Sequence, residues 1–373
     1  MYGGFLSMGV VMGMTGPLLP FLRADLHLSY AEAGLLFSAQ SVGSFAVLVL
    51  GGWLVHAFGK KRLLLAGSVA YALGMAATAV APDFWWVLAG NVFIGTGMSL
   101  LDIGISTLCI DANPQGKGRA LNQLHFYFGA GAVLGPLVAL ALAHLDGGWR
   151  WAFGLMALAP VALAVLVPFL KTPPSPQATV AQKLAVYRKP FLWWGALALF
   201  MYCGVEWGVG AWFPSYWKTV PGTASLDPAW AVSLFWLTFA VGRFVQGAWA
   251  DAMGFQRFLT LGIGATVAVT VLWVLFPQPL AALVWILIFG FVIAGQYPTF
   301  VALISHRYPE ASGQVTSFLS VFASLGTLFW PPAVGAWADT RGMGALPWAQ
   351  LAMALLLAGA AAVAFLSARK TRG

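Results

Sequence analysis

The sequence predicts an all-α integral membrane protein with twelve transmembrane helices in two six-helix halves. Hydrophobic residues make up 60% of the 373 positions and charged residues only 8%, whereas a typical soluble domain is about 25% charged. Apolar segments long enough to cross the roughly 30 Å hydrocarbon core of a bilayer recur along the whole chain. Segments such as 63–80 are apolar on every face, so the alternating pattern of a membrane β-barrel is absent and the helices must form a bundle.

Twelve candidate spans account for this hydrophobicity, each separated from the next by a short polar, proline-containing or glycine-containing break. Their approximate ranges are 2–22, 33–55, 63–81, 84–109, 120–143, 151–170, 191–217, 230–250, 258–276, 280–304, 315–337 and 346–367. Met1 leads directly into the first span, with neither a basic stretch nor a small-residue cleavage site before Arg23. The first helix is therefore expected to act as its own insertion signal, without a cleavable leader.

Basic side chains are distributed unevenly between the two sides of the membrane. If the N-terminus is cytoplasmic, fourteen Lys and Arg residues fall on the cytoplasmic side, four fall on the opposite side, and Arg243 lies within a span. The positive-inside rule then places both termini in the cytoplasm. Topology and contact with anionic lipid headgroups explain the net charge of +8, so nucleic acid is not an expected partner. We expect a multi-pass protein of the plasma (inner) membrane that works as a monomer.

The second half of the chain repeats the first at an offset of 195 residues. Without any gap, this offset superposes, among other residues, the seven pairs of glycines named next, three pairs of prolines and one pair of arginines. The paired glycines are Gly52 and Gly247, Gly59 and Gly254, Gly67 and Gly262, Gly95 and Gly290, Gly118 and Gly313, Gly131 and Gly326, and Gly147 and Gly342. So many coincidences in one register indicate an internal duplication.

The duplication divides the chain into an N-terminal six-helix bundle over 1–170 and a C-terminal six-helix bundle over 191–373. The segment 171–190 between them begins with several prolines and carries four basic and no acidic residues. It has no apolar run long enough to cross a membrane, so we expect a cytoplasmic linker. Parallel duplication, with a substrate site between the halves near mid-membrane, is an architecture of secondary transporters.

The loop after the second span of each half carries a glycine-rich, charged motif. Its defining residues are Gly52, His56, Gly59 and Arg62 in the first copy and Gly247, Asp251, Gly254 and Arg257 in the second. The motif resembles the signature loop of the major facilitator superfamily, which implies a secondary transporter whose loop acts as a conformational latch. Glycine permits a tight turn, and the acid can receive a helix N-terminus or a basic partner. His56 stands where the family has Asp, so either this latch is weaker or pH-sensitive, or His56 is a tolerated loop residue.

The fifth and seventh spans resemble a narrower group of the same superfamily. Residues 121–136 and 202–216 are similar to the fucose-permease-type branch, which contains sugar:cation symporters. The resemblance implies alternating-access uptake of a sugar, or a similar small polar solute, with a proton or sodium ion. The fucose permease has an acid in its first helix, where this chain has uncharged residues around Met14, and its fourth-helix carboxylate corresponds to about Leu101, next to Asp102. A different coupling arrangement is therefore compatible with the resemblance.

A glycine-proline element in the fifth span keeps a second transport hypothesis open. Gly131, Gly135 and Pro136 also resemble part of the fifth-helix signature of drug:proton antiporters, although Ala139 and Leu140 replace its last two glycines. That resemblance implies proton-coupled export of a drug or metabolite. Small residues at this spacing also permit close helix packing by themselves.

Four ionisable residues lie within the predicted spans: Asp102, His125, Glu206 and Arg243. A charged side chain at mid-membrane depth costs about 2.5–3.5 kcal/mol on insertion scales, so its presence points to function. Asp102 and His125 lie at matching depth and could share a proton, or form a static hydrogen bond. We expect Asp102, His125 and Glu206 to couple transport to the cation. Arg243 either pairs with a carboxylate or contacts the substrate.

Polar and aromatic side chains on the spans that resemble cavity-lining helices predict the chemistry of the substrate. The candidate binding residues are Glu206, Tyr202, Asn122, Gln123, Gln296, Tyr297 and Arg243. Amides and carboxylates that bind hydroxyls, beside aromatic faces, suit a sugar or polyol ring. Two acids to one arginine within the membrane disfavour an anionic substrate without excluding it.

The sequence contains no pattern of an enzyme or a metalloprotein. The five His residues are dispersed, and zinc-protease, serine-hydrolase and Walker-type motifs are absent. Cys109 and Cys203 fall in spans of different halves and form neither a disulfide framework nor a metal-ligand pattern. We therefore expect no catalytic activity, no cofactor and no metal, and a small solute, a coupling cation and membrane lipid as the partners.

Overall fold

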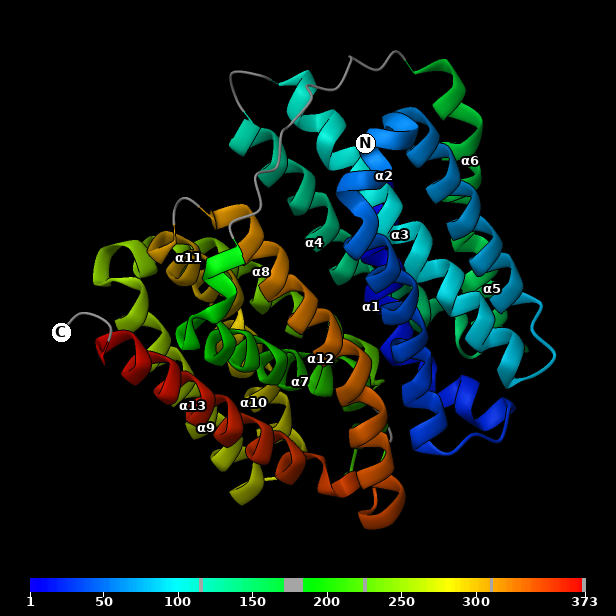
Figure 1. Cartoon of the computed structure of the whole chain (residues 1–373). Helices are drawn as coiled ribbons and strands as arrows, with labels where there is room; N and C mark the ends of the chain where they lie inside the picture. The colour runs from blue at the N-terminus through cyan, green and yellow to red at the C-terminus, as the bar shows by residue number, and fades with distance from the viewer. Residues whose placement is uncertain (114–116, 171–183, 224–226, 309–310, 371–373) are drawn as a thin grey trace. The chain divides into compact units, whose positions relative to one another are not determined.

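The computed structural model describes residues 1–113, 117–170, 184–223, 227–308 and 311–370; within these ranges, the side chains of 51–53, 55–57, 110–111, 117–122, 184–185, 312–313 and 368–370 are not described. The described residues form twelve helices long and apolar enough to cross a membrane (Figure 1). This confirms the predicted all-α membrane class. The chain divides into two compact units, Met1–Thr179 and Val180–Gly373.

The first unit is built from four long helices and three short ones. They are α1 (Tyr2–Asp25), α2 (Tyr30–Ala79), α3 (Phe84–Ala112), α4 (Lys117–Leu142), α5 (Gly148–Met156), α6 (Leu158–Leu166) and the 3-10 helix η1 (Val167–Phe169). The long helix α2 contains the second and third predicted spans, joined at a kink whose backbone is not helical at Gly59. Within this unit α2 packs against α3, and α1 packs against α4.

The second unit follows the same plan. Its elements are η2 (Leu184–Arg188), α7 (Pro190–Trp217), α8 (Pro228–Met253), α9 (Phe255–Leu275), α10 (Pro279–Ile293), α11 (Gln296–Arg307), α12 (Ser312–Arg341), η4 (Met343–Ala345) and α13 (Leu346–Lys370). Helix α7 packs against α12 and α13, drawn in orange and red in Figure 1, and α8 packs against α10. The contact of α7 with α12 is the repeat of the contact of α1 with α4.

Two predicted spans are interrupted, and each interruption has a proline just beyond it. In the sixth span the helix stops at Met156 and resumes at Leu158, because Pro160 has no N–H to donate to the carbonyl of Met156. The tenth span stops at Ile293 and resumes at Gln296. We expected one continuous helix in both places, since apolar residues dominate both segments.

The backbone conformation repeats in the same register as the glycine pairs of the sequence. Every described residue with positive φ belongs to a pair separated by 195 residues: His27 and Gly222, Gly59 and Gly254, and Gly147 and Gly342. Positive φ is rare outside glycine, so its recurrence in one register is not a by-product of helical geometry. The backbone therefore turns at equivalent positions in both halves.

Glycines on α4 and α12 allow close contact with the neighbouring helix in each unit. A Cβ on Gly131 would lie 2.2 Å from the carbonyl oxygen of Leu6 on α1, and a Cβ on Gly326 would lie 2.6 Å from that of Phe200 on α7. The backbones approach so closely that no side chain fits between them. Helix packing thus accounts for Gly131, part of the element that resembles an exporter signature.

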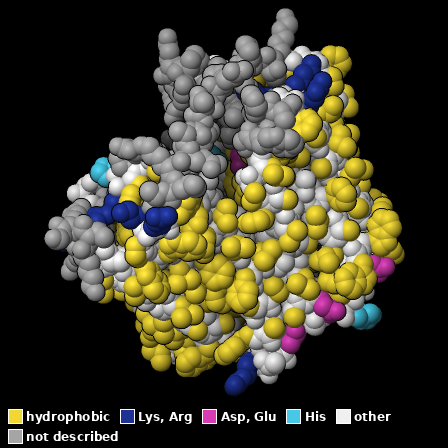
Figure 2. Space-filling model, in the orientation of Figure 1, with side chains coloured by type: hydrophobic (Ala, Val, Ile, Leu, Met, Phe, Trp, Pro, Cys, Tyr) yellow, Lys and Arg dark blue, Asp and Glu magenta, His cyan; other side chains and the backbone are white. Residues whose placement is uncertain are grey.

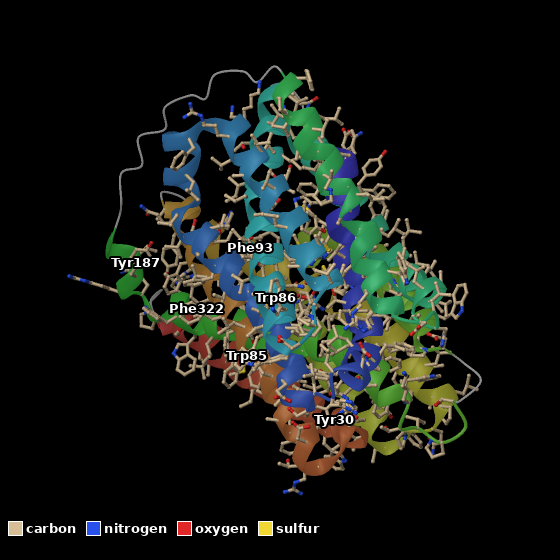
Figure 3. All side chains as sticks on the ribbon, turned by 90° about the vertical axis from the view of Figure 1, so that its right-hand side faces the viewer. Tyr30, Trp85, Trp86, Phe93, Tyr187 and Phe322 are labelled. Atoms are coloured by element: carbon tan, nitrogen blue, oxygen red, sulfur yellow. The ribbon has the colours of Figure 1, made fainter. Side chains whose placement is uncertain are left out.

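The surface of each unit is apolar, as a lipid-facing protein requires. Figure 2 shows hydrophobic side chains over most of the visible face, with few charged ones among them. Trp85, Trp86 and Phe93 on α3, labelled in Figure 3, are 71%, 53% and 49% exposed. The two tryptophans stand near the start of the helix, where amphipathic rings favour the membrane interface.

Candidate functional site

One face of helix α7 packs against α13, and the opposite face carries Tyr202 and Glu206. On one face, a Cβ on Gly208 would lie 2.0 Å from the end of the Gln350 side chain, so the missing side chain lets α13 approach. Tyr202 and Glu206, one turn apart, each lie about 200° around the helix from a glycine of that face. Tyr202 is fully buried and Glu206 is only 8% exposed. A buried carboxyl is thus held in the middle of a span by packing behind it.

Gln350 inserts its amide into the turn of α7 that contains Glu206. When the nitrogen and oxygen of this amide exchange places, which satisfies both atoms, the nitrogen donates to the carbonyl of Val205 and the oxygen accepts from the N–H of Val209, each at 3.2 Å. The side chain is fully buried on α13. An amide inserted between two groups that normally bond to each other loosens a helical turn while satisfying both groups.

The interruption between α10 and α11 lies opposite this turn and exposes backbone groups at mid-membrane. Pro298 has no N–H, so the carbonyl of Ala294, four residues earlier, has no helical donor. Arg243 on α8 supplies one, since its Nε lies 3.4 Å from that oxygen. The guanidinium also stacks on the ring of Phe239 at 4.5 Å. Arg243 therefore replaces the hydrogen bond that the proline removes.

Two further side chains satisfy the neighbouring backbone groups. Gln246 on α8 accepts from the N–H of Gly295 at 2.8 Å and donates to the carbonyl of Phe291 at 2.5 Å. The hydroxyl of Tyr202 donates to the carbonyl of Ile293 at 3.1 Å. A buried backbone group without a partner would be costly in a membrane. Side chains of α7 and α8 therefore stabilise the interruption by satisfying its backbone groups.

Four of the predicted site residues converge there. The hydroxyl of Tyr202 is in hydrogen-bonding contact with the carboxyl of Glu206, which also interacts electrostatically with Arg243. The ring of Tyr297 lies 5.9 Å from that of Tyr202, and Tyr297 interacts electrostatically with both Glu206 and Arg243. Predicted site residues from three separate spans thus form one cluster, named here the α7–α8–α11 cluster: Tyr202, Glu206, Arg243 and Tyr297.

Gln296, adjacent to Tyr297 in sequence, lies outside this cluster. Its amide nitrogen donates to the hydroxyl of Thr266 on α9 at 2.8 Å and to the carbonyl of Val292 at 3.2 Å. The residue is fully buried, and its amide oxygen has no partner among the described residues. In this structure Gln296 joins α11 to α9.

In the first unit, Asp102 is half-buried on α3 and accepts a hydrogen bond from the hydroxyl of Ser106 at 3.2 Å. His125 on α4 is exposed and interacts electrostatically with Asp102, while its ring meets that of Phe5 edge-on at 5.4 Å. Gln123 accepts from the hydroxyl of Tyr2 at 3.3 Å. The side chain of the remaining predicted residue, Asn122, lies outside the described part.

The two latch loops turn at glycines with unusual backbone angles. Gly59 has φ 71° and ψ 159°, and Gly254 has φ 85° and ψ 137°. This region is accessible essentially to glycine alone. Arg62, Asp251 and Arg257 are exposed and Gly247 lies within α8, while the burial of Gly52 and the side chain of His56 are outside the described part.

The sequence analysis did not single out Gln246 and Gln350, which hold the backbone around the cluster. Each is a lone amide in an apolar span, and its partners are backbone groups that come near only after folding. A signal was present for the interruption itself, because Pro298 stands within a span, next to the polar residues Gln296 and Thr299. Among the described residues, no group of three or more His, Cys, Asp and Glu side chains could hold a metal ion.

Comparison with known proteins agrees with this architecture. The family model of the Major Facilitator Superfamily matches residues 1–331 and 222–373, which together span the chain. The glucose/galactose transporter of Brucella abortus is 25% identical over 362 residues, covering 91% of this chain and 87% of its own. The cis,cis-muconate transport protein of Acinetobacter baylyi is 26% identical over 312 residues, covering 78% of this chain and 74% of its own.

Solved structures share the fold at lower identity. A D-xylose-proton symporter superposes with a TM-score of 0.80 at 17% identity, covering 96% of this chain and 94% of its own. A nucleoside transporter superposes with a TM-score of 0.84 at 11% identity, covering 98% of each chain. Twelve membrane-spanning helices and a family match over the whole length identify a multi-pass membrane transporter and not an enzyme: the chain belongs to the Major Facilitator Superfamily.

Proposed function

We propose that this protein takes up a sugar, or a similar small polar solute, together with a proton by alternating access. The observation that carries the proposal is the α7–α8–α11 cluster, where a buried carboxyl and two phenols meet at an interrupted helix. Transporters bind substrate and ions at discontinuous helices near mid-membrane. The glucose/galactose transporter among the relatives and the xylose-proton symporter among the structural neighbours support the sugar and the proton.

The cluster favours a proton over sodium as the coupling ion. A metal cation needs several oxygen ligands that are not already engaged. The carbonyls of Phe291, Ile293 and Ala294 already accept from Gln246, Tyr202 and Arg243. A guanidinium beside the carboxyl would also repel a metal cation. A proton needs only the carboxyl of Glu206.

We propose different tasks for the two intramembrane acids. Asp102, with His125 as its electrostatic neighbour, takes up and releases the coupling proton in the first unit. Glu206 binds the solute as well as a proton, beside Tyr202 and Tyr297. A solute accumulates against its gradient only if protonation changes the relative stability of the inward-open and outward-open states.

The location, the topology and the latch belong to the same proposal. Both termini lie in the cytoplasm, the membrane is the plasma (inner) membrane, and the working unit is a monomer, as the distribution of basic residues and the family suggest. The glycine turns at Gly59 and Gly254 allow the latch loops to bend sharply between their helices. Close packing of α1 against α4 explains Gly131 without an exporter signature, so we propose uptake and not export.

Transport assays on purified protein in liposomes test these roles. With an inward proton gradient we expect accumulation of D-glucose, D-galactose or D-xylose, the probes that the relatives suggest. Asp102→Asn should lose accumulation but retain counterflow, because exchange needs no net deprotonation. Glu206→Gln should lose both, because it removes a binding group.

Asp146→Asn serves as the control, since it removes an exposed acid between α4 and α5. It should behave like the unmodified protein in both assays. If folded Asp102→Asn and Glu206→Gln variants both accumulate solute at the normal rate, the coupling groups lie elsewhere and this mechanism is wrong.

A further inference from the structure

We propose that Arg243 binds a carboxylate on the transported solute, so that the solute is a sugar acid that enters with a proton on Glu206. The inference rests on the proposed function and names the substrate class of the same site. Arg243 lies fifteen residues after the first residue of α8 (Pro228–Met253), far from either end of that span.

The Arg243 guanidinium is held in place but only partly engaged. Its Nε donates to the carbonyl of Ala294 at 3.4 Å, and its carbon lies 4.5 Å from the centre of the Phe239 ring. Among the described residues, neither terminal nitrogen has a hydrogen-bond acceptor, and the residue is exposed. Two parallel N–H groups on a fixed plane match the two oxygens of a carboxylate. A lysine could satisfy the backbone carbonyl, but it could not offer this fork as well.

The neighbouring half-helix adds to the attraction for an anion. Helix α11 begins at mid-span at Gly295, which has no side chain of its own and whose N–H donates to the side chain of Gln246. The N-terminus of a helix carries partial positive charge. Since Arg243 contacts Ala294, the residue before Gly295, the guanidinium and this helix end lie next to each other.

Charge balance links the anion to the proton. When Glu206 is ionised, its negative charge cancels that of Arg243 and would repel a second carboxylate. A proton on Glu206 removes this repulsion and leaves Arg243 uncompensated. By thermodynamic linkage, the bound anion must then favour the protonated form of Glu206 to the same degree.

The same balance discourages leakage of protons. The Glu206–Arg243 pair has no net charge when empty, and none when it holds both a proton and a carboxylate. With the proton alone the pair carries one positive charge, which is costly within the membrane. The other titratable groups around the pair are Tyr202, Cys203 and Tyr297, all of which are neutral when protonated.

Matched solutes test this assignment. D-glucuronate and D-galacturonate differ from D-glucose and D-galactose only by a carboxylate in place of a hydroxymethyl group. At pH 5.5 we expect calorimetric titration of the purified protein to show at least tenfold tighter binding of one of the acids than of its neutral partner. Binding of the acid should take up about one proton, and the affinity for the acid should fall as the pH rises.

Variants of Arg243 separate its binding role from its structural one. Arg243→Gln should lower the affinity for the acid at least tenfold and that for the neutral sugar less than twofold, with Arg243→Lys intermediate. Because Arg243 also satisfies Ala294, the same change is made together with Pro298→Ala, which returns a backbone N–H to that carbonyl. The loss of acid binding should persist in this double variant.

The possible outcomes separate the inference from the proposed function. Accumulation of a neutral sugar but neither acid under an inward proton gradient would leave proton symport standing and refute the role of Arg243. An equal loss of both solutes in the double variant would refute it too. If no solute of either kind responds to the proton gradient, the proposed function is wrong and this assignment falls with it.

Discussion

The second latch loop offers a clean test of how its backbone shape supports the fold. Gly247 and Gly254 belong to the same motif, and a Cβ added to either would meet nothing within 4 Å. They differ in conformation alone, because Gly247 lies within α8 whereas Gly254 has φ 85° and ψ 137°. Gly254→Ala and Gly247→Ala therefore introduce the same methyl group into two different backbone environments.

The two substitutions should shift stability in opposite directions. An alanine forced into the conformation of Gly254 costs about 1–3 kcal/mol. Alanine in place of glycine inside a helix, as at Gly247, gains up to about 1 kcal/mol. The variants should thus differ by roughly 1–4 kcal/mol in the free energy of unfolding, which corresponds to about fivefold to 1,000-fold in the folding equilibrium.

Unfolding of the purified protein by sodium dodecyl sulfate in mixed micelles, followed by far-ultraviolet circular dichroism, measures this difference. Gly254→Ala should unfold at lower detergent fraction than the unmodified protein, and Gly247→Ala at an equal or higher one. Equal midpoints for the two variants would refute the reasoning, because steric space is open at both sites and only the backbone angle distinguishes them.

Two further substitutions test packing and the interrupted helix. Gly131→Ala should destabilise the first unit by about 1–3 kcal/mol through overpacking, whereas Gly129→Ala, whose Cβ meets nothing within 4 Å, should not; thermal unfolding of both variants measures this. Pro298→Ala should raise the unfolding temperature, because alanine returns a backbone N–H to the carbonyl of Ala294, and should slow counterflow by joining α10 to α11 in one straight helix. A variant that is no more stable than the unmodified protein would mean that Arg243 already compensates the proline fully.

Much of the architecture could be predicted from the sequence because a membrane imposes few solutions. Long apolar segments must be helices, and the 195-residue register of glycines predicted the two halves. That register also coincides with the positions where the backbone turns, such as Gly59 and Gly254. Glycine was informative there because these turns need backbone angles that other residues rarely adopt.

The site was harder to predict, for physical reasons. The sequence indicated that Glu206 and Arg243 are costly to place in lipid. Whether the two side chains lie close together depends on how α7, α8 and α10 pack, and hydropathy does not encode that packing. Gln246 carries no such mark, since its partners are backbone groups freed by a proline on another helix. A count of charges likewise disfavoured an anionic solute, because it could not show that the terminal nitrogens of Arg243 are still available.

The interrupted helix also restricts how this half of the protein can move. Tyr202 reaches it from α7, while Arg243 and Gln246 reach it from α8. A slide of either helix by one turn, about 5.4 Å, would separate several polar backbone groups from their partners, which is costly within a membrane. We therefore expect α7, α8 and the interrupted helix to move together, which leaves the bending to corners such as Gly254.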